Sequence, residues 1–216
     1  MQHGKRLIYV HDPMCSWCWG FRPAFDELSL RLADHIPIVR LLGGLAPDSD
    51  RPMPAEQQAF LQDTWRHIQQ RIPGTRFNFG FWQDCRPRRS TWPACRAVIA
   101  ARAIAAPAEP RMIDAIQRAY YLDARNPSDD ETLVALAAEL GLDTDRFATL
   151  LSAASTHQTL ATEIAEAQGM GATSFPSLRL QIDSSYLPIT VDYNDATTMF
   201  DRIRDALDSR APRSPV

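Results

Sequence analysis

The stretch Cys15-Ser16-Trp17-Cys18 decides how the rest of the chain is interpreted. It stands between an apolar run, Leu7 to Val10, and a segment beginning near Trp19 that has helical spacing. Two cysteines separated by two residues, where a strand passes into a helix, are typical of a redox site, because the helix dipole and free backbone N–H groups favour a thiolate. The pattern predicts thiol–disulfide exchange, with Cys15 as the exposed nucleophile and Cys18 as the buried thiol that resolves the mixed disulfide.

Composition and charge describe an ordinary globular chain. Its 216 residues are 45% hydrophobic and 23% charged, which suffices for a hydrophobic core. The net charge of −3 provides no basic surface for nucleic acid, and the densest positive cluster, Arg86 to Arg89, is interpreted as a solvated turn before a helix. No stretch approaches the ~20 apolar residues of a membrane span, and residues 1–6 lead into a strand without the apolar segment of a signal peptide. We therefore expect a cytoplasmic protein without nucleic-acid or membrane partners.

Periodicity and turn signals predict two α/β halves around a block of helices. The expected elements are strands 7–11 and 36–42 with helix 19–34 between them, helices 55–72, from 90–93 to about 104, 111–123, from 128 to about 140, from 143 or 144, and 155–168, strands 177–182 and 186–191, and a last helix after 194. The first three form a βαβ unit, which implies parallel strands. Three local features are specific: a capping box that starts at Ser128, a strand made an edge strand by Pro188, and a helix capped by Asn194.

These elements predict an α/β fold with a four-stranded mixed sheet and a large α-helical insertion. Alternating polarity in residues 177–182 is typical of a half-buried strand. The expected division is a βαβ half with the CxxC in residues 1–50, a helical insertion or lid in 51–169, a ββα half in 170–209 and a flexible tail in 210–216.

The run from Asp12 to Gly20 (DPMCSWCWG) and the segment Gly171 to Pro176 (GATSFP) before a late strand resemble the DsbA family of thioredoxin-fold proteins. They are most similar to its cytoplasmic FrnE-like branch of predicted protein-disulfide isomerases, which the Gly43-Gly44-Leu45 turn also resembles. The resemblance covers nearly the whole chain, including the helical insertion. It implies a thioredoxin-like fold and a protein-disulfide oxidoreductase or isomerase.

The resemblance also implies a cis peptide bond at Pro176, packed beside the active-site sulfurs. Such a bond presents the preceding backbone, Ser174 and Phe175, to an extended substrate. Trp17, which lies between the two cysteines, is expected to face solvent or substrate. Periplasmic DsbA enzymes carry Pro-His at this place, whereas Ser16-Trp17 has no ionisable group, so their strong stabilisation of the thiolate is not implied here.

His11 stands four residues before the first cysteine, at the end of a strand. It is a candidate to tune the thiolate or to shuttle a proton. The alternative is a structural histidine, since strand alternation places it on the same face as Tyr9 and Leu7.

Cys85 and Cys95 leave two interpretations open. Free cysteines are often buried as small hydrophobic residues, so both can belong to a core. They can also form a second redox pair or a regulatory disulfide, because Cys95 follows Pro93 in an expected first helical turn, where a thiol pKa falls. A four-cysteine zinc site is disfavoured, because this pair lacks the short spacing of a zinc knuckle.

We expect protein or glutathione disulfides as substrates, no metal, and no cofactor apart from glutathione as a co-substrate. One alternative is a glutathione-dependent isomerase or transferase of the kappa-class type, but those proteins carry serine at the nucleophile position, where Cys15 stands. A second is a non-catalytic polypeptide-binding module that uses Trp17 and the aromatic run 77–82. Reductase, oxidant and isomerase activity all remain open at this point.

Overall fold

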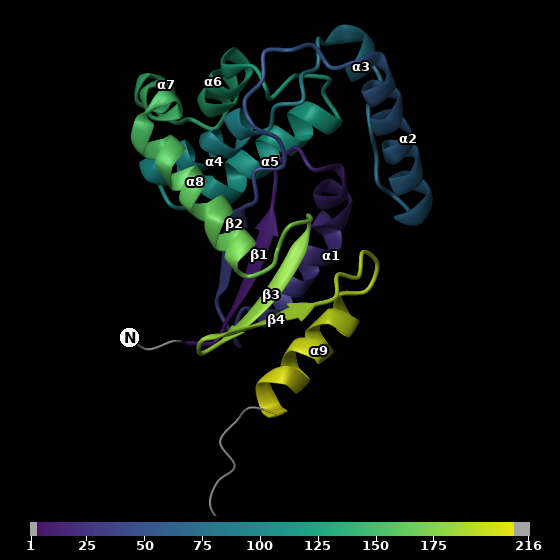
Figure 1. Ribbon diagram of the computed structural model, residues 1–216, viewed down its shortest axis with the longest axis vertical. Helices are drawn as coiled ribbons and strands as arrows, with labels where there is room; N and C mark the ends of the chain where they lie inside the picture. Colours follow the sequence, from purple (N-terminus) through teal and green to yellow (C-terminus); the bar gives the residue numbers. More distant parts are fainter. Residues whose placement is uncertain (1–3, 210–216) are drawn as a thin grey trace, which may run out of the picture.

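The computed structural model describes residues 4–209, and the expected flexible tail, 210–216, lies outside the described residues. Two strands and one helix lie at each end of this range, and helices fill its middle (Figure 1). In chain order the elements are β1 (Arg6–His11), α1 (Ser16–Leu32), β2 (Ile38–Leu42), α2 (Ala55–Arg71), α3 (Phe81–Asp84), α4 (Trp92–Ile104), α5 (Ala108–Tyr121), α6 (Asp130–Glu139), α7 (Thr144–Ser152), α8 (Ala154–Gly169), β3 (Ser177–Ile182), β4 (Ser185–Ile189) and α9 (Ala196–Ser209).

The sheet has four strands in the order β2-β1-β3-β4. β1 runs parallel to β2, with Leu7 opposite Ile38, and antiparallel to β3, with Leu7 opposite Leu180. β3 and β4 pair antiparallel, and Pro188 lies on the edge strand β4, as a residue without a backbone N–H should. The predicted mixed sheet with a thioredoxin-like order of elements is confirmed.

Helices cover both faces of the sheet. On one face, Leu7 and Tyr9 of β1 pack with Phe25 of α1 and Met199 of α9. On the other, Ile8 and Val10 pack with residues at the end of α8. Alternate residues of β1 therefore serve two separate cores, which explains why this strand is apolar along its whole length.

A third core lies among the helices α2 to α8, which gather at the end of the sheet toward which β1 points (Figure 1). Trp65, Val98 and Tyr121 are fully buried in it. Met14 and Leu42 belong to the same cluster, so residues beside the CxxC turn and at the end of β2 share the core of the helical block. Among the helices of residues 4–209, none has the length and apolar character needed to cross a membrane.

Two expected helix caps are wrong. The Ser128 hydroxyl donates to the carbonyl of Ser90 at 2.6 Å, and the N-cap of α6 is Asp129. At α9, Asp195 accepts the backbone N–H groups of Thr197 and Thr198, where Asn194 had been expected. In both places several capping residue types adjoin one another, and long-range contacts decide which of them caps.

The half-buried character expected for β3 is also wrong. Five of its residues are buried and Arg179 is half-buried, because β3 lies inside the sheet between β1 and β4. Its polar residues find partners there: Gln181 accepts from Arg6 of β1, and Arg179 donates to the carbonyls of Met170 and Gly171.

Candidate active site

The CxxC stretch forms the first turn of α1, which begins at Ser16 and not near Trp19 as expected. Pro13 is the second residue of a turn in which the Cys15 N–H donates to the carbonyl of Asp12 at 3.0 Å. Cys15 is the N-cap residue, with φ −81° and ψ 116°, and its own carbonyl accepts the N–H of Trp19. The first sulfur thus lies at a helix N-terminus, where the helix dipole favours negative charge.

The two thiols lie beside the late proline loop. Cys15 Sγ donates to the carbonyl oxygen of Phe175 at 3.5 Å, and the peptide bond between Phe175 and Pro176 is cis, as the resemblance implied. Both thiols are free. Cys15 is 6% exposed and Cys18 is fully buried. The expectation that Cys15 is exposed is therefore wrong, because the proline loop covers it, although it remains the more accessible of the two.

Burial raises the pKa of the Cys18 thiol well above its usual value, and a hydrogen bond with Cys15 raises it further. The thiol of Cys18 is therefore protonated until it reacts. Cys18 is also a neighbour of the Tyr9 hydroxyl, whose pKa is raised well above its usual value, chiefly by burial.

The two residues between the cysteines point in different directions. Ser16 is buried, and its hydroxyl accepts a hydrogen bond from the indole N–H of Trp65 at 2.9 Å. Trp17 is half-buried between the rings of His67 and Tyr193, at centroid distances of 5.8 and 5.2 Å. Ser16 therefore joins α1 to α2, while Trp17 is left partly open to solvent.

A groove of about 360 Å³ lies over Cys15. We call it the cysteine groove, and its lining residues come from four segments: the active-site turn (Met14, Cys15, Ser16, Trp17), α2 (Phe60, Leu61, Thr64), the segment before α4 (Arg88, Arg89, Ser90, Thr91) and the proline loop (Thr173, Ser174, Phe175), with Leu45, Met53 and Tyr120. Phe60 is 67% exposed on its rim, which leaves a large apolar surface available to a bound molecule. The structure thus brings Cys15, Trp17, Ser174 and Phe175 together around one cavity of ligand size.

Asp12 is a residue of the site that the sequence interpretation missed. Its carboxylate is fully buried and accepts from the N–H of Met14 at 2.8 Å, the N–H of Leu45 at 2.7 Å and the hydroxyl of Thr91 at 2.6 Å. It joins the CxxC turn, the segment after β2 and the start of α4. Burial raises its pKa, and these hydrogen bonds oppose that shift. The Asp-to-Met14 contact is a local turn pattern visible in a sequence, whereas the other two are not.

His11 lines a second cavity of about 190 Å³ behind Cys18. It is 1% exposed, stacks on Tyr9 at 4.9 Å between ring centroids, and neither ring nitrogen has a hydrogen-bond partner among the described residues. Burial lowers its pKa to about 3, and the charges of Arg40 and Arg102 act in the same direction. His11 lies on the same face of β1 as Tyr9, as strand alternation predicted, and the imidazole is neutral at physiological pH.

Cys85 and Cys95 lie in different surroundings. Cys85 is half-buried and its thiol donates to the carbonyl of Ala124 at 3.0 Å, whereas Cys95 is fully buried with its thiol 3.5 Å from the carboxylate of Asp12. No disulfide joins them. The pKa expected to fall for Cys95 at a helix N-terminus is instead raised, first by burial and then by the charge of Asp12. Within residues 4–209, no group of three or more His, Cys, Asp or Glu side chains is arranged to hold a metal ion.

Comparisons with known proteins agree with this geometry. A family model described as thioredoxin matches residues 8–185. A crystal structure from Nitrosomonas europaea, provisionally assigned as a protein disulfide isomerase, has a TM-score of 0.83 at 25% identity and covers 96% of this chain and 100% of that one. The cytosolic disulfide reductase DsbM from Pseudomonas aeruginosa, also solved with GSH, has a TM-score of 0.72 at 24% identity over 95% and 98% of the two chains. A crystal structure from Streptomyces coelicolor, provisionally assigned as a DsbA oxidoreductase, has a TM-score of 0.73 at 22% identity and covers 98% of this chain and 94% of that one. A search of curated proteins found no match.

Proposed function

The chain belongs to the thioredoxin family and is a DsbA-like thiol–disulfide oxidoreductase or isomerase, and we propose that Cys15 and Cys18 are its reactive thiols. The observation that supports this assignment is the position of Cys15 at the N-terminus of α1, on the floor of a groove and in contact with the proline loop. The DsbA-family resemblance drawn from the sequence is confirmed. The roles of individual residues are part of the proposal.

The reaction has two exchange steps. The Cys15 thiolate attacks one sulfur of a substrate disulfide, a mixed disulfide forms, and the other substrate sulfur leaves as a thiolate that takes up a proton from solvent. Cys18 then gives up its proton and attacks Cys15 Sγ, the Cys15–Cys18 disulfide forms, and the second substrate sulfur leaves as a thiolate that takes up that proton. The two cysteines are oxidised and the substrate disulfide is reduced. The raised pKa of Cys18 keeps it from competing as the first nucleophile.

Other residues of the cysteine groove contact the substrate in this proposal. Ser174 and Phe175 offer backbone groups beside Cys15, with Pro176 fixing the loop behind them, and Trp17 offers an aromatic surface. Ser16 and His11 affect the site indirectly. Ser16 does so through its hydrogen bond with Trp65 of α2, and His11 through the cavity behind Cys18. The segments 1–50 and 170–209 supply the reactive groups, and the insertion 51–169 shapes access to them.

We further propose protein or glutathione disulfides as substrates, no metal, and glutathione as a co-substrate with no bound cofactor. The cytosolic reductase DsbM, whose structure was solved with GSH, supports both the glutathione substrate and a cytoplasmic location for this chain.

The test is to replace Cys15 with serine and measure reduction of insulin or isomerisation of a scrambled protein. Cys15→Ser should abolish turnover, because no thiolate remains at the helix N-terminus, and Cys18→Ser should trap mixed disulfides. Cys85→Ser serves as a control that removes a half-buried thiol outside the groove, and it should retain turnover. Activity in the Cys15→Ser protein would refute the proposal.

The direction of electron flow follows from the redox potential of the Cys15–Cys18 couple, measured against glutathione buffers. A value near roughly −270 mV would mark a reductase, and one near about −120 to −180 mV an oxidant or isomerase.

A further inference from the structure

Two arginines in the segment before α4 differ in whether their charge is paired. Arg88 and Arg89 both line the cysteine groove. Arg88 is neutralised, because its guanidinium donates to the carbonyl of Ser128 at 2.5 Å and pairs with the carboxylate of Asp129 at 2.6 Å. Arg89 is half-buried and makes no hydrogen bond or ion pair with any residue of the described range 4–209. The expectation of a solvated turn is therefore wrong for this pair.

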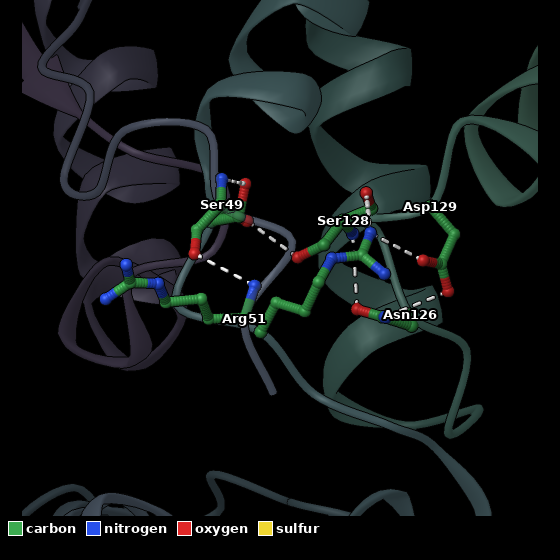
Figure 2. Close-up of polar contacts among 7 residues, drawn as sticks. Ser49, Arg51, Asn126, Ser128 and Asp129 are labelled. Atoms are coloured by element: carbon green, nitrogen blue, oxygen red, sulfur yellow. Dashed lines mark hydrogen bonds and ion pairs between the residues drawn. The ribbon is translucent and has the colours of Figure 1, made fainter. Parts of the chain in front are cut away.

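The backbone that carries Arg89 is held on both sides. The Ser90 hydroxyl accepts from the N–H of Ser49 at 3.2 Å, and the Ser90 carbonyl accepts from the hydroxyl of Ser128 at 2.6 Å. Figure 2 shows this network, in which Asn126 also bonds both Ser128 and Asp129. On the other flank, the N–H of Met53 donates to the carbonyl of Pro87 at 2.8 Å. Because the backbone on both sides is held, the Arg89 side chain starts from a fixed position beside the groove.

Apart from the Cys15 thiolate, the groove contains no anionic group to balance this charge. Its lining residues include Arg88 and Arg89 but no aspartate or glutamate. Tyr120, another lining residue, is near enough to Arg89 that the guanidinium lowers its pKa, but the larger effect of burial raises the pKa of this phenol well above its usual value. The phenol is therefore neutral, and it cannot serve as the anionic partner of Arg89. A half-buried guanidinium without a partner is suited to an anion supplied by a ligand.

We propose that Arg89 is a specificity-determining residue that binds a carboxylate of the substrate, so that the groove selects small disulfides with carboxylate groups near the reacting sulfur. This inference rests on the proposed function of Cys15. A guanidinium binds a carboxylate through two parallel hydrogen bonds, which would orient the disulfide toward Cys15 Sγ as well as attract it. The groove volume of about 360 Å³ fits a small-molecule ligand. The exchange itself is unchanged: one substrate disulfide becomes two thiols as Cys15 and Cys18 become a disulfide.

The experiment compares two small disulfides with the reduced protein in stopped-flow measurements. Glutathione disulfide carries carboxylates, and bis(2-hydroxyethyl) disulfide carries none. Arg89→Gln should lower the rate constant with glutathione disulfide about tenfold or more, the effect of a hydrogen bond to a charged group, and leave the rate with the neutral disulfide within about twofold. Arg89→Lys should recover part of the loss, because it restores the charge but not the planar geometry.

Arg51→Gln is the matched control, since Arg51 is exposed, lies outside the groove and carries the same charge. It should leave both rates unchanged. Equal loss with both disulfides in Arg89→Gln, or loss with neither, would overturn the proposal. If the wild-type protein reduces insulin but reacts with glutathione disulfide no faster than a free thiol does, the substrate class is wrong while the function of Cys15 stands. If Cys15→Ser retains insulin turnover, the proposed function itself fails.

Discussion

His11 shows how a single buried residue makes the stability of the fold depend on pH. The folded protein holds the imidazole neutral with a pKa of about 3, while an unfolded chain binds its proton near pH 6.5. Between these values the unfolded state binds the extra proton, so acidification favours unfolding. This group stabilises the fold fully above pH 6.5, and its contribution is lost as the pH falls.

We expect the free energy of unfolding to decrease by up to about 1.4 kcal/mol per pH unit between pH 6.5 and 3 because of this residue. Denaturant titrations at pH 7, 6 and 5 measure the slope. His11→Gln should be less stable at pH 7 but should lose this part of the slope. His157→Gln, a change at an exposed histidine of α8, should keep it. The same slope in His11→Gln as in the wild type would contradict the assignment.

At the scale of the elements, the end of β2 is packed against the proline loop. Gly43 follows β2, and its N–H donates to the carbonyl of His11 at 2.7 Å. A Cβ atom at this position would lie 2.0 Å from Cε1 of the Phe175 ring. Glycine is required here by this close approach. The Phe175 carbonyl in turn contacts Cys15 Sγ. The distance between the end of β2 and the proline loop therefore controls the position of this carbonyl beside the reactive thiol.

Gly43→Ala should displace Phe175 and lower disulfide turnover by roughly tenfold to a hundredfold, because small displacements at a reacting centre carry large rate penalties. Far-UV circular dichroism should show the same helix content as the wild type. Gly169→Ala is the control, since a Cβ there meets no atom within 4 Å, and its turnover should match the wild type. Full turnover in Gly43→Ala would show that the position of Phe175 does not matter to the reaction.

At the scale of the whole molecule, Glu163 ties the helical block to the sheet. Its carboxylate is buried on α8, accepts the N–H of Leu42 in β2 at 2.9 Å, and pairs with Arg102 of α4. Arg102 also pairs with Glu109 of α5 at 3.0 Å. One carboxylate therefore connects a strand with several helices of the insertion, and the two parts should unfold together.

Glu163→Gln should lower the free energy of unfolding by roughly 2–3 kcal/mol, because the amide removes the more buried of the two carboxylates that pair with Arg102 and weakens the contact with the N–H of Leu42. Unfolding followed by far-UV circular dichroism and by tryptophan fluorescence should give one coincident transition, in the wild type and in the variant. Glu139→Gln breaks a more exposed pair with Arg125 and should cost less than about 1 kcal/mol. Two separate transitions would contradict the coupling through Glu163.

Much of the architecture could be predicted from local sequence patterns. The apolar run of β1, the edge strand marked by Pro188 and the N-cap at Asp143, whose side chain accepts from the N–H of Arg146, all follow from interactions among near neighbours. The pairing of Cys15 with Pro176 came from the resemblance of two motifs, not from periodicity. These features depend on residue types and spacings that a sequence displays directly.

Other features were decided by contacts between distant parts of the chain. Ser128 binds the Ser90 carbonyl and does not cap α6, and Cys95 lies beside the Asp12 carboxylate, which raises its pKa. Asp12 and Arg89 have roles set by which residues surround them, and those neighbours stand dozens of positions away. Short-range sequence patterns do not show which distant residues become neighbours in the fold.

The sequence by itself determined the class of reaction, because a CxxC at a strand–helix junction places a thiol at a helix N-terminus whatever the remaining topology. Only the tertiary structure decided that Cys15 lies nearly buried under the proline loop and that an unpaired Arg89 faces the same groove. The physical reason is the distance along the chain over which each effect arises. The helix dipole acts within one turn, whereas burial and charge pairing depend on segments brought together by folding.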